Sequence, residues 1–363
     1  MADLLNILYL GPISGTCLDR ANALRRLGHQ VKHIDLRTLL PKTSWVDKVT
    51  WYLGGNLLVP LLIPNLGKAL KDEQYDLGWV DGGEWVTLKV IKLLRRHAQK
   101  IVSYSIDDPL GPRDGPRFKA YRQSLPYYDL NAVVRNENVA EAYALGAIDV
   151  LRVYRSADEV SHAPRKLSES DHQVWDTEVL FLGTWFPERG PFLLDLISLG
   201  VPLTIQGSGW HKAPEWPQLK AYWRGGSIAG DDYAKAIQCA KVNLGMVSKE
   251  NRDLHTTRSL EIPALGGLLC AERTIEHTQM YEEGKEALFW SDSEECAAMC
   301  KLALADESGR QAIANAGEQR LHLNGHLNQK EMQLIIAGVD FSKKSVRCTS
   351  PDFKKTEFLK MVS

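Results

Sequence analysis

Residues 251–273 of this 363-residue chain have the sequence NRDLHTTRSLEIPALGGLLCAER and lead from one apolar run to the next. The run before them, residues 242–246, and the run within them, residues 268–270, are each short enough to be a buried strand. The segment between the two runs predicts a short helix. A strand, a helix and a second strand in this order predict a parallel sheet covered by helices.

The sequence also marks the ends of this short helix. Thr256 and Thr257 are expected to cap its start, and Gly266 with Gly267 to end it. Pro263 removes a hydrogen bond from the helix interior, so the helix is expected to be short or bent.

The start of the same helix is the predicted ligand site. Ligands of open α/β sheets bind where the carboxyl end of a strand leads into a helix, and the free N–H groups there attract phosphate. Arg258 adds a cation, and Glu261, one turn later, can accept hydrogen bonds from two ribose hydroxyls. Asp253 can reach another polar ligand group. An ordinary capped helix with a surface Arg–Glu pair remains the alternative.

Composition sets the broad class of the protein. A hydrophobic content of 44% and a charged content of 25% are those of a globular protein with room for two domains. The formal net charge of -1 gives no reason to expect a nucleic-acid partner. The six cysteines show no metal-binding spacing, which predicts reduced thiols and a cytoplasmic protein. No signal peptide and no membrane-spanning run are expected.

Apolar runs alternate with helical patterns along both halves of the chain, which predicts two Rossmann-like α/β domains. The expected parts are an amino-terminal domain over 1–155, a linker over 156–177, a carboxy-terminal domain over 178–325, and a helix with a polar tail over 326–363. Strands are expected at residues 5–10, 30–34, 77–80, 100–105, 128–134 and 150–154, then at 178–183, 201–206, 242–246, 268–270 and 286–290.

Residues 41–66 interrupt this alternation with aromatic and aliphatic side chains among lysines. Pro60 and Pro64 argue against one continuous helix. Aromatic-rich stretches are usually buried, so an apolar cover over the sheet is expected. Peripheral contact with a membrane, or with an apolar acceptor, stays open as the alternative.

Two turns in the first half have residues suited to a second substrate. The turn at residues 11–16 follows the first strand but lacks the full G-x-G-x-x-G pattern, so it is either a tight turn or the border of a cleft. Asp107 follows a predicted strand and is a candidate general base on an acceptor hydroxyl. Asp107, Asp108 and Pro109 are explained equally well as a turn.

Several motifs of the second half resemble those of the CgeB-like (spore maturation protein) glycosyltransferases, which have the GT-B fold. The motifs lie at residues 258–267, at 271–273 with His277, at 282–287, and at 181–185 with Arg189. Residues 27–29, 107–109 and 146–147 resemble the amino-terminal domain of that group more loosely. The resemblance spans about residues 5–325.

The resemblance implies a nucleoside-diphosphate sugar as donor, bound mainly by the carboxy-terminal domain. It aligns Asp253 and Glu261 with the paired acids, spaced E-x7-E, of the related family-four transferases, and this analogy implies a retaining reaction. It places Arg189 at a phosphate-binding position. Thr184 stands where an arginine is usual, and Asp253 is shorter than the usual glutamate.

The sequence shows no convincing D-x-D metal motif, so we expect a metal-independent reaction with no cofactor. Cationic side chains and a helix start would then stabilise the leaving diphosphate. His255 can hydrogen-bond the leaving group or serve only as a neighbour of the helix cap. The catalytic candidates are Asp107, Asp253 and His255. The donor-binding candidates are Arg189, Gly207, Ser208, Lys249, Thr257, Arg258, Ser259 and Glu261.

The expected partners are a nucleotide sugar and an unidentified acceptor: a glycan, a lipid-linked molecule or a protein. Two other functions stay open on the same architecture. One is a nucleotide- or sugar-binding module without turnover. The other is an epimerase or phosphorylase acting on related sugars.

Overall fold

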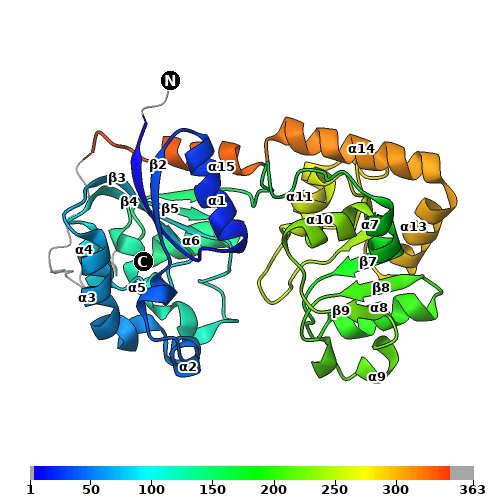
Figure 1. Ribbon diagram of the computed structural model, residues 1–363, viewed down its shortest axis with the longest axis horizontal. Helices are drawn as coiled ribbons and strands as arrows, with labels where there is room; N and C mark the ends of the chain where they lie inside the picture. The colour runs from blue at the N-terminus through cyan, green and yellow to red at the C-terminus, as the bar shows by residue number, and fades with distance from the viewer. Residues whose placement is uncertain (1–3, 344–363) are drawn as a thin grey trace, which may run out of the picture.

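The computed structural model describes residues 4–343 and contains two parallel six-stranded sheets that lie side by side (Figure 1). The first sheet has the order β2-β1-β3-β4-β5-β6, and the second has the order β12-β11-β10-β7-β8-β9. Helices cover both sheets. The predicted fold class, α/β with two Rossmann-like halves, is confirmed.

The strands lie close to the predicted apolar runs because central parallel strands are buried on both faces. The first sheet comprises β1 (Asn6–Leu10), β2 (Gln30–Ile34), β3 (Tyr75–Asp81), β4 (Ala98–Ser105), β5 (Leu130–Val133) and β6 (Val150–Arg152). The second comprises β7 (Thr177–Leu182), β8 (Leu203–Gln206), β9 (Trp223–Gly225), β10 (Ala240–Gly245), β11 (Leu269–Glu272) and β12 (Leu288–Trp290). The short, exposed edge strand β9 had no apolar signal and was not predicted.

Most helices of the first half connect consecutive strands. They are α1 (Gly15–Arg26), α2 (Ser44–Leu53), α3 (Val59–Leu70), α4 (Leu88–Leu94), α5 (Lys119–Ser124) and α6 (Asn136–Ala144), with 3-10 turns η1 (Leu36–Leu39), η2 (Gly55–Leu58), η3 (Gly115–Phe118) and η4 (Leu125–Tyr127). The second half contains α7 (Glu169–Trp175), α8 (Arg189–Ser198), η5 (Trp210–Lys212), α9 (Trp216–Leu219), α10 (Gly230–Gln238), α11 (Arg258–Ala264), α12 (Ile275–Met280), α13 (Ser293–Ala305), α14 (Glu307–Asn324) and α15 (Asn328–Ala337).

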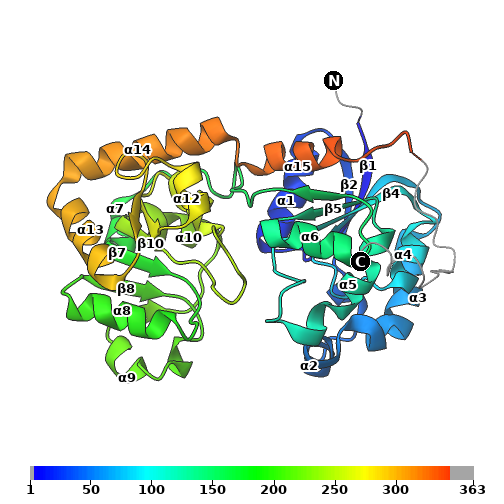
Figure 2. The ribbon, with the colours of Figure 1, turned by 180° about the vertical axis from the view of Figure 1, so that it is seen from behind.

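The chain returns to its first half at the end. Gly325, with a φ of 73°, terminates α14, and α15 then packs against α1 (Figures 1 and 2). Met332 and Ile335 of α15 join the same core cluster as the first-sheet residues Ile7 and Trp79. The carboxy-terminal helix therefore contributes to the core beside the first sheet. The rest of the predicted polar tail, residues 344–363, lies outside the described residues.

The polar stretch around residues 155–177 is more ordered than its composition indicated. Ser168 and Asp171 form a capping box that starts α7. Asp158 is buried and accepts hydrogen bonds from the backbone of Val160 and Ser161 and from the side chain of Asn328. Side-chain hydrogen bonds order this stretch beside a few apolar contacts, such as those of Ala157 and Trp175, so hydrophobic periodicity did not reveal it.

Residues 41–66 do not form one continuous helix, as expected, but the break lies at Gly54 and η2 and not at a proline. Pro60 lies in the first turn of α3, whereas Pro64 is accommodated inside that helix. One face of α2 and α3 packs into the core through Val46, Leu62 and Leu66. In the described part of the chain, no helix combines the length and apolar character needed to cross a bilayer.

Candidate active site

The carboxyl ends of two strands of the second sheet border a pocket of about 200 Å³. Gly183 and Thr184 follow β7, and Met246 follows β10. Arg189, at the start of α8, and Arg258, at the start of α11, line the same pocket. Two helix starts and two guanidinium groups thus meet at the carboxyl edge of a parallel sheet, where anionic ligands bind.

Gly207 shapes the border of this pocket without lining it. Its φ is 147°, and a Cβ atom there would overlap with the backbone carbonyl of Gly183. The glycine therefore lets the ends of β7 and β8 approach closely. Ser208 accepts a hydrogen bond from the backbone N–H of Trp185 at 2.9 Å.

Arg189 is a buried cation with unused hydrogen-bonding capacity. Its Nη1 donates to the carbonyl of Thr184 at 2.8 Å, and its guanidinium lies 4.4 Å from the centre of the Phe186 ring. Its Nε has no partner within residues 4–343. Burial lowers the pKa of Arg189 to about 10, so the side chain is charged at neutral pH. A buried cation with a free donor is suited to an anion.

Arg258 is held by an acid and an aromatic ring. Its Nη1 donates to Glu261 at 2.5 Å, its Nε donates to the carbonyl of Leu182 at 3.2 Å, and its guanidinium lies 4.7 Å from the centre of the Tyr233 ring. The Tyr233 hydroxyl also donates to Glu261, at 2.5 Å. These contacts fix the direction of the Arg258 side chain.

Glu261 lies behind Arg258 and does not line the pocket. The residue is only 2% exposed. Burial opposes ionisation of its carboxyl, but Arg258, His162 and the Tyr233 hydrogen bond outweigh it, so its pKa lies below the ordinary value. In this conformation the carboxylate positions Arg258 and has no surface for a ribose.

The expected threonine caps of α11 are wrong. Thr257 occupies the cap position, but it has helical backbone angles and its side chain caps nothing. The Ser259 hydroxyl instead accepts from the backbone N–H of Thr256 at 3.0 Å. Ser259 is buried, and its oxygen also lies 2.7 Å from Nε2 of His277. Thr257 lines the pocket, whereas Ser259 supports the helix start from inside.

Asp253 points away from the pocket and toward the first domain. Its carboxylate is buried and pairs with Arg135 and Arg155, the latter at 2.8 Å. The adjacent Arg252, with a φ of 53°, pairs with Asp108 and Glu141 of the first half. The loop expected to hold the donor therefore bridges the two domains, a role that its local sequence did not indicate.

His255 and Lys249 also lie away from the two arginines. The His255 ring is buried, with Nδ1 2.5 Å from Glu276 and Nε2 accepting from the backbone N–H of Arg155 at 3.1 Å. Neither ring nitrogen is left for a leaving group in this conformation. The Lys249 side chain is 70% exposed and lies 3.6 Å from Glu272.

A second pocket, of about 360 Å³, lies at the carboxyl edge of the first sheet. Its lining includes the turn at residues 11–16, residues 82–84 and Asp107. The turn at residues 11–16 therefore borders a cleft, which was one of its two interpretations. The Asp107 side chain is 42% exposed and lies 3.7 Å from Arg117, which also pairs with Glu84. Burial raises the pKa of Glu84, although Arg117 opposes this shift. Residues 82–84 were expected along the path of the acceptor, whereas Arg117 was not among the predicted site residues.

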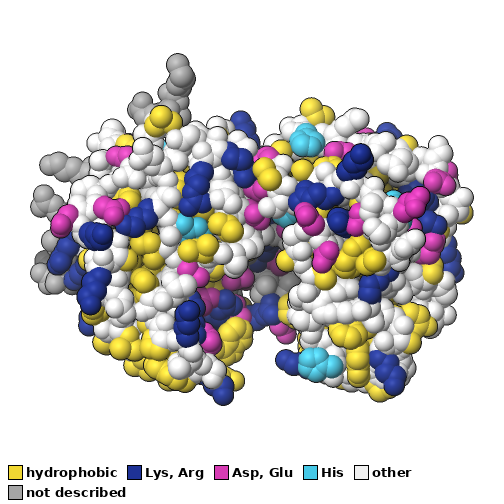
Figure 3. Space-filling view, in the orientation of Figure 1, with side chains coloured by type: hydrophobic (Ala, Val, Ile, Leu, Met, Phe, Trp, Pro, Cys, Tyr) yellow, Lys and Arg dark blue, Asp and Glu magenta, His cyan; other side chains and the backbone are white. Residues whose placement is uncertain are grey.

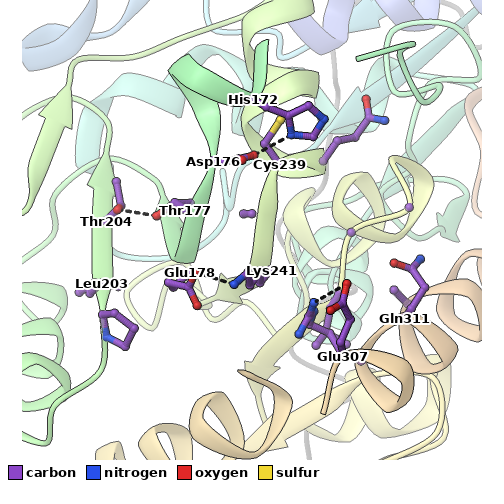
Figure 4. Close-up of a pocket in the computed structure, with 18 of the residues that line it drawn as sticks. His172, Asp176, Thr177, Glu178, Leu203, Thr204, Cys239, Lys241, Glu307 and Gln311 are labelled. Carbon is purple, nitrogen blue, oxygen red and sulfur yellow. Dashed lines mark hydrogen bonds and ion pairs between the residues drawn. The ribbon is translucent and has the colours of Figure 1, made fainter. Parts of the chain in front are cut away.

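A further pocket, of about 820 Å³, lies at the opposite edge of the second sheet (Figure 4). Thr177, Leu203 and Ala240, at the amino ends of β7, β8 and β10, line it. Strand ends of this kind are not where α/β sheets bind their ligands. The pocket between Arg189 and Arg258 is therefore the better donor site.

Comparisons with known proteins bear on the fold and on the class of protein. Residues 189–337 match a family model described as glycosyl transferase-like. No curated protein sequence matches at a significant level.

Solved structures match nearly the whole chain at low identity. Anabaena Alr3699/HepE in complex with UDP-glucose matches with a TM-score of 0.62 and 14% identity, covering 92% of this chain and 98% of that one. Sucrose-phosphate synthase from Thermosynechococcus elongatus matches with a TM-score of 0.64 and 13% identity, covering 92% and 97%. A UDP-forming trehalose-phosphate synthase from Burkholderia xenovorans matches with a TM-score of 0.62 and 12% identity, covering 95% and 100%.

These matches support the predicted glycosyltransferase. Because the identities are low, the solved structures establish the fold, and the family match concerns the second half of the chain. The chain has the GT-B fold of two facing Rossmann-like halves, and its second half is glycosyl transferase-like.

Proposed function

We propose that this protein transfers a sugar from a nucleoside-diphosphate sugar to an acceptor hydroxyl. The observation that carries the proposal is the meeting of Arg189 and Arg258 at the carboxyl edge of the second sheet. When the bond between the sugar and the diphosphate breaks, negative charge grows on the diphosphate. Two guanidinium groups and two helix starts at that point stabilise the charge.

The donor carries uracil in this proposal. Anabaena HepE was solved with UDP-glucose, and the Burkholderia enzyme is UDP-forming. Ser208 and residues 224–230 are assigned to the base, and Glu261 to positioning Arg258. Contact between Glu261 and the ribose would require the carboxylate to leave Tyr233 when the nucleotide binds. The assignment to the CgeB-like group is part of the proposal, supported by the motif at residues 258–267.

The acceptor binds in the first-domain pocket, where Glu84 and Asp107 accept hydrogen bonds from its hydroxyl groups. Asp107 is the more exposed of the two and is assigned as the base that receives the proton. Four carboxylates and two arginines line this pocket, and this excess of negative charge favours a polyhydroxyl acceptor over an anionic one.

The reaction is proposed to need no metal and to retain the anomeric configuration. The first point rests on the donor pocket, whose charged lining residues are both arginines. Within residues 4–343, the two residue groups with metal-ligand geometry lie elsewhere, at Cys270 with Cys296 and Cys300, and at His172 with Asp176 and Cys239. The proposal that the anomeric configuration is retained rests on the analogy with the paired-acid transferases of family four.

The test is release of free nucleoside diphosphate from a panel of nucleotide sugars, with and without a chelator. We expect turnover with a UDP sugar that survives chelation, and a loss of ~10²–10³-fold in Arg258→Ala. Arg310→Ala is a matched control, because Arg310 lies in the pocket at the other edge of the sheet. Equal turnover in wild type and Arg258→Ala would refute the donor site.

A second candidate is a nucleotide-binding protein without turnover. It is favoured by Asp253, which pairs with Arg135 and Arg155 instead of facing the donor pocket. Calorimetric binding of UDP without product from any donor and acceptor pair would support this candidate over the first.

A further inference from the structure

The outer face of α2, η2 and α3 carries an unusual concentration of exposed apolar side chains, which we call the α2–α3 patch. Each of these side chains is between 44% and 69% exposed. Figure 3 shows apolar side chains gathered at the lower end of the first domain, where Figure 1 places α2. The patch comprises Trp45, Trp51, Tyr52, Leu53, Leu57 and Leu61.

The patch is not a poorly packed core. The opposite face of the same helices is fully buried through Val46, Leu58 and Leu62. Single exposed apolar residues are normal on soluble proteins, but neighbouring tryptophan, tyrosine and leucine side chains mark an interaction surface. One face of these helices therefore packs into the core, and the opposite face is available to contact a partner.

The charges around the patch indicate the nature of that partner. Lys42, Lys48 and Lys119 are all exposed beside it. The only acidic side chain in α2, Asp47, is paired with Arg37 at 2.8 Å. Lysine is depleted in protein–protein interfaces, whereas lysines flanking tryptophan and leucine are typical of helices that lie on anionic lipid.

The patch is directly connected to the first-domain pocket. The Arg117 guanidinium lies 5.3 Å from the centre of the Trp51 ring and pairs with Glu84 in that pocket. The Trp85 indole donates to the Thr50 hydroxyl of α2 at 2.8 Å. A surface that contacts the patch would therefore lie beside the pocket.

We propose that the α2–α3 patch docks this protein on an anionic lipid surface, with the first-domain pocket beside the bilayer. The apolar side chains enter the region between headgroups and acyl chains, and the lysines contact the anionic headgroups. This inference does not depend on the proposed reaction.

The test is co-sedimentation of the full chain with vesicles of zwitterionic lipid, alone or mixed with anionic lipid. We expect wild-type protein to bind the anionic vesicles and the triple variant Trp45→Ser, Leu53→Ser, Leu57→Ser to lose roughly tenfold or more in binding. Lys42→Glu with Lys48→Glu should lose a similar factor on anionic vesicles only.

The matched control is Val174→Ser with Leu302→Ser, two side chains of similar exposure in the second half. This control should bind vesicles like the wild type, and thermal melting should show that every variant is folded. Wild-type protein that stays in the supernatant with anionic vesicles would overturn the proposal. So would equal binding by the triple variant. Concentration-dependent dimerisation that the triple variant abolishes, without vesicle binding, would assign the patch to a second copy of the chain instead.

Discussion

Arg252 donates a hydrogen bond to each carboxylate oxygen of Asp108, from Nε to Oδ2 at 2.7 Å and from Nη2 to Oδ1 at 2.8 Å. The arginine belongs to the loop after β10 and the aspartate to the loop after β4, so the contact joins the two domains. Such bidentate pairs are strong and geometrically specific. The contact fixes the spacing of the two loops that lead to the donor and acceptor pockets.

Asp108→Asn is expected to weaken the contact between the two domains. The loss of its charge-assisted hydrogen bonds should cost about 2 kcal/mol of stability at this contact. Burial opposes ionisation of Asp108, but Arg252 and Asn138 hold its pKa below the ordinary value. A depressed carboxyl pKa gives stability that is present above about pH 4 and lost as pH falls further. Small-angle scattering should therefore show a larger radius in the variant, and in the wild type in acid. Asp47→Asn, in an exposed pair, is the control, and equal radii in all samples would contradict the prediction.

Arg189→Gln is expected to reduce turnover by ~10²–10³-fold, because the buried cation stabilises charge that develops on the leaving diphosphate. Arg189→Lys should recover only part of this loss, because an ammonium lacks the planar donor geometry. The measurement is initial-rate kinetics with the preferred nucleotide sugar. Full activity in Arg189→Gln would exclude diphosphate binding at this arginine.

The sheets were predictable from sequence, whereas the bridging loop was not. Central strands such as β10 are buried on both faces and therefore read as continuous apolar runs. The Arg252–Asp108 pair joins residues 144 positions apart, and no local pattern reveals such a partner. Asp253 was expected at the donor for the same reason: the spacing to Glu261 was visible, but Arg135 and Arg155 were not.

Local chemistry also misled the expectation for the start of α11. Thr256 and Thr257 precede the helix, but the hydroxyl of Ser259 makes the capping contact from inside the first turn. Which of these hydroxyls caps the helix depends on the direction of its side chain. The direction of the Ser259 side chain depends on its contact with His277 of α12. Arg258 was expected in the first turn of this helix, and it is the first residue of α11.

Gly207→Ala is expected to disrupt the donor pocket, because the new Cβ would overlap with the Gly183 carbonyl at a φ of 147°. Calorimetry should show weaker nucleotide binding, and the melting temperature should fall. Gly67→Ala, in α3 of the first half, is the matched control, since a Cβ there meets open space. Unchanged nucleotide affinity and melting temperature in Gly207→Ala would contradict this prediction. They would show that the ends of β7 and β8 can move apart without a loss of free energy.

His255 is expected to make the protein less stable as pH falls below about 6.5, the ordinary histidine pKa. Burial, together with Arg155 and Arg152, holds the pKa of His255 well below that value. Its Nε2 accepts a backbone hydrogen bond, so the folded protein keeps the ring neutral, whereas the unfolded chain takes up a proton. The melting temperature of the wild type should therefore drop between pH 7 and pH 5 by more than that of His255→Gln. Turnover corrected for unfolding should show no matching pH step, because this ring has no free nitrogen for a substrate. A step in turnover that disappears in His255→Gln, with parallel melting curves, would instead restore His255 to a catalytic role.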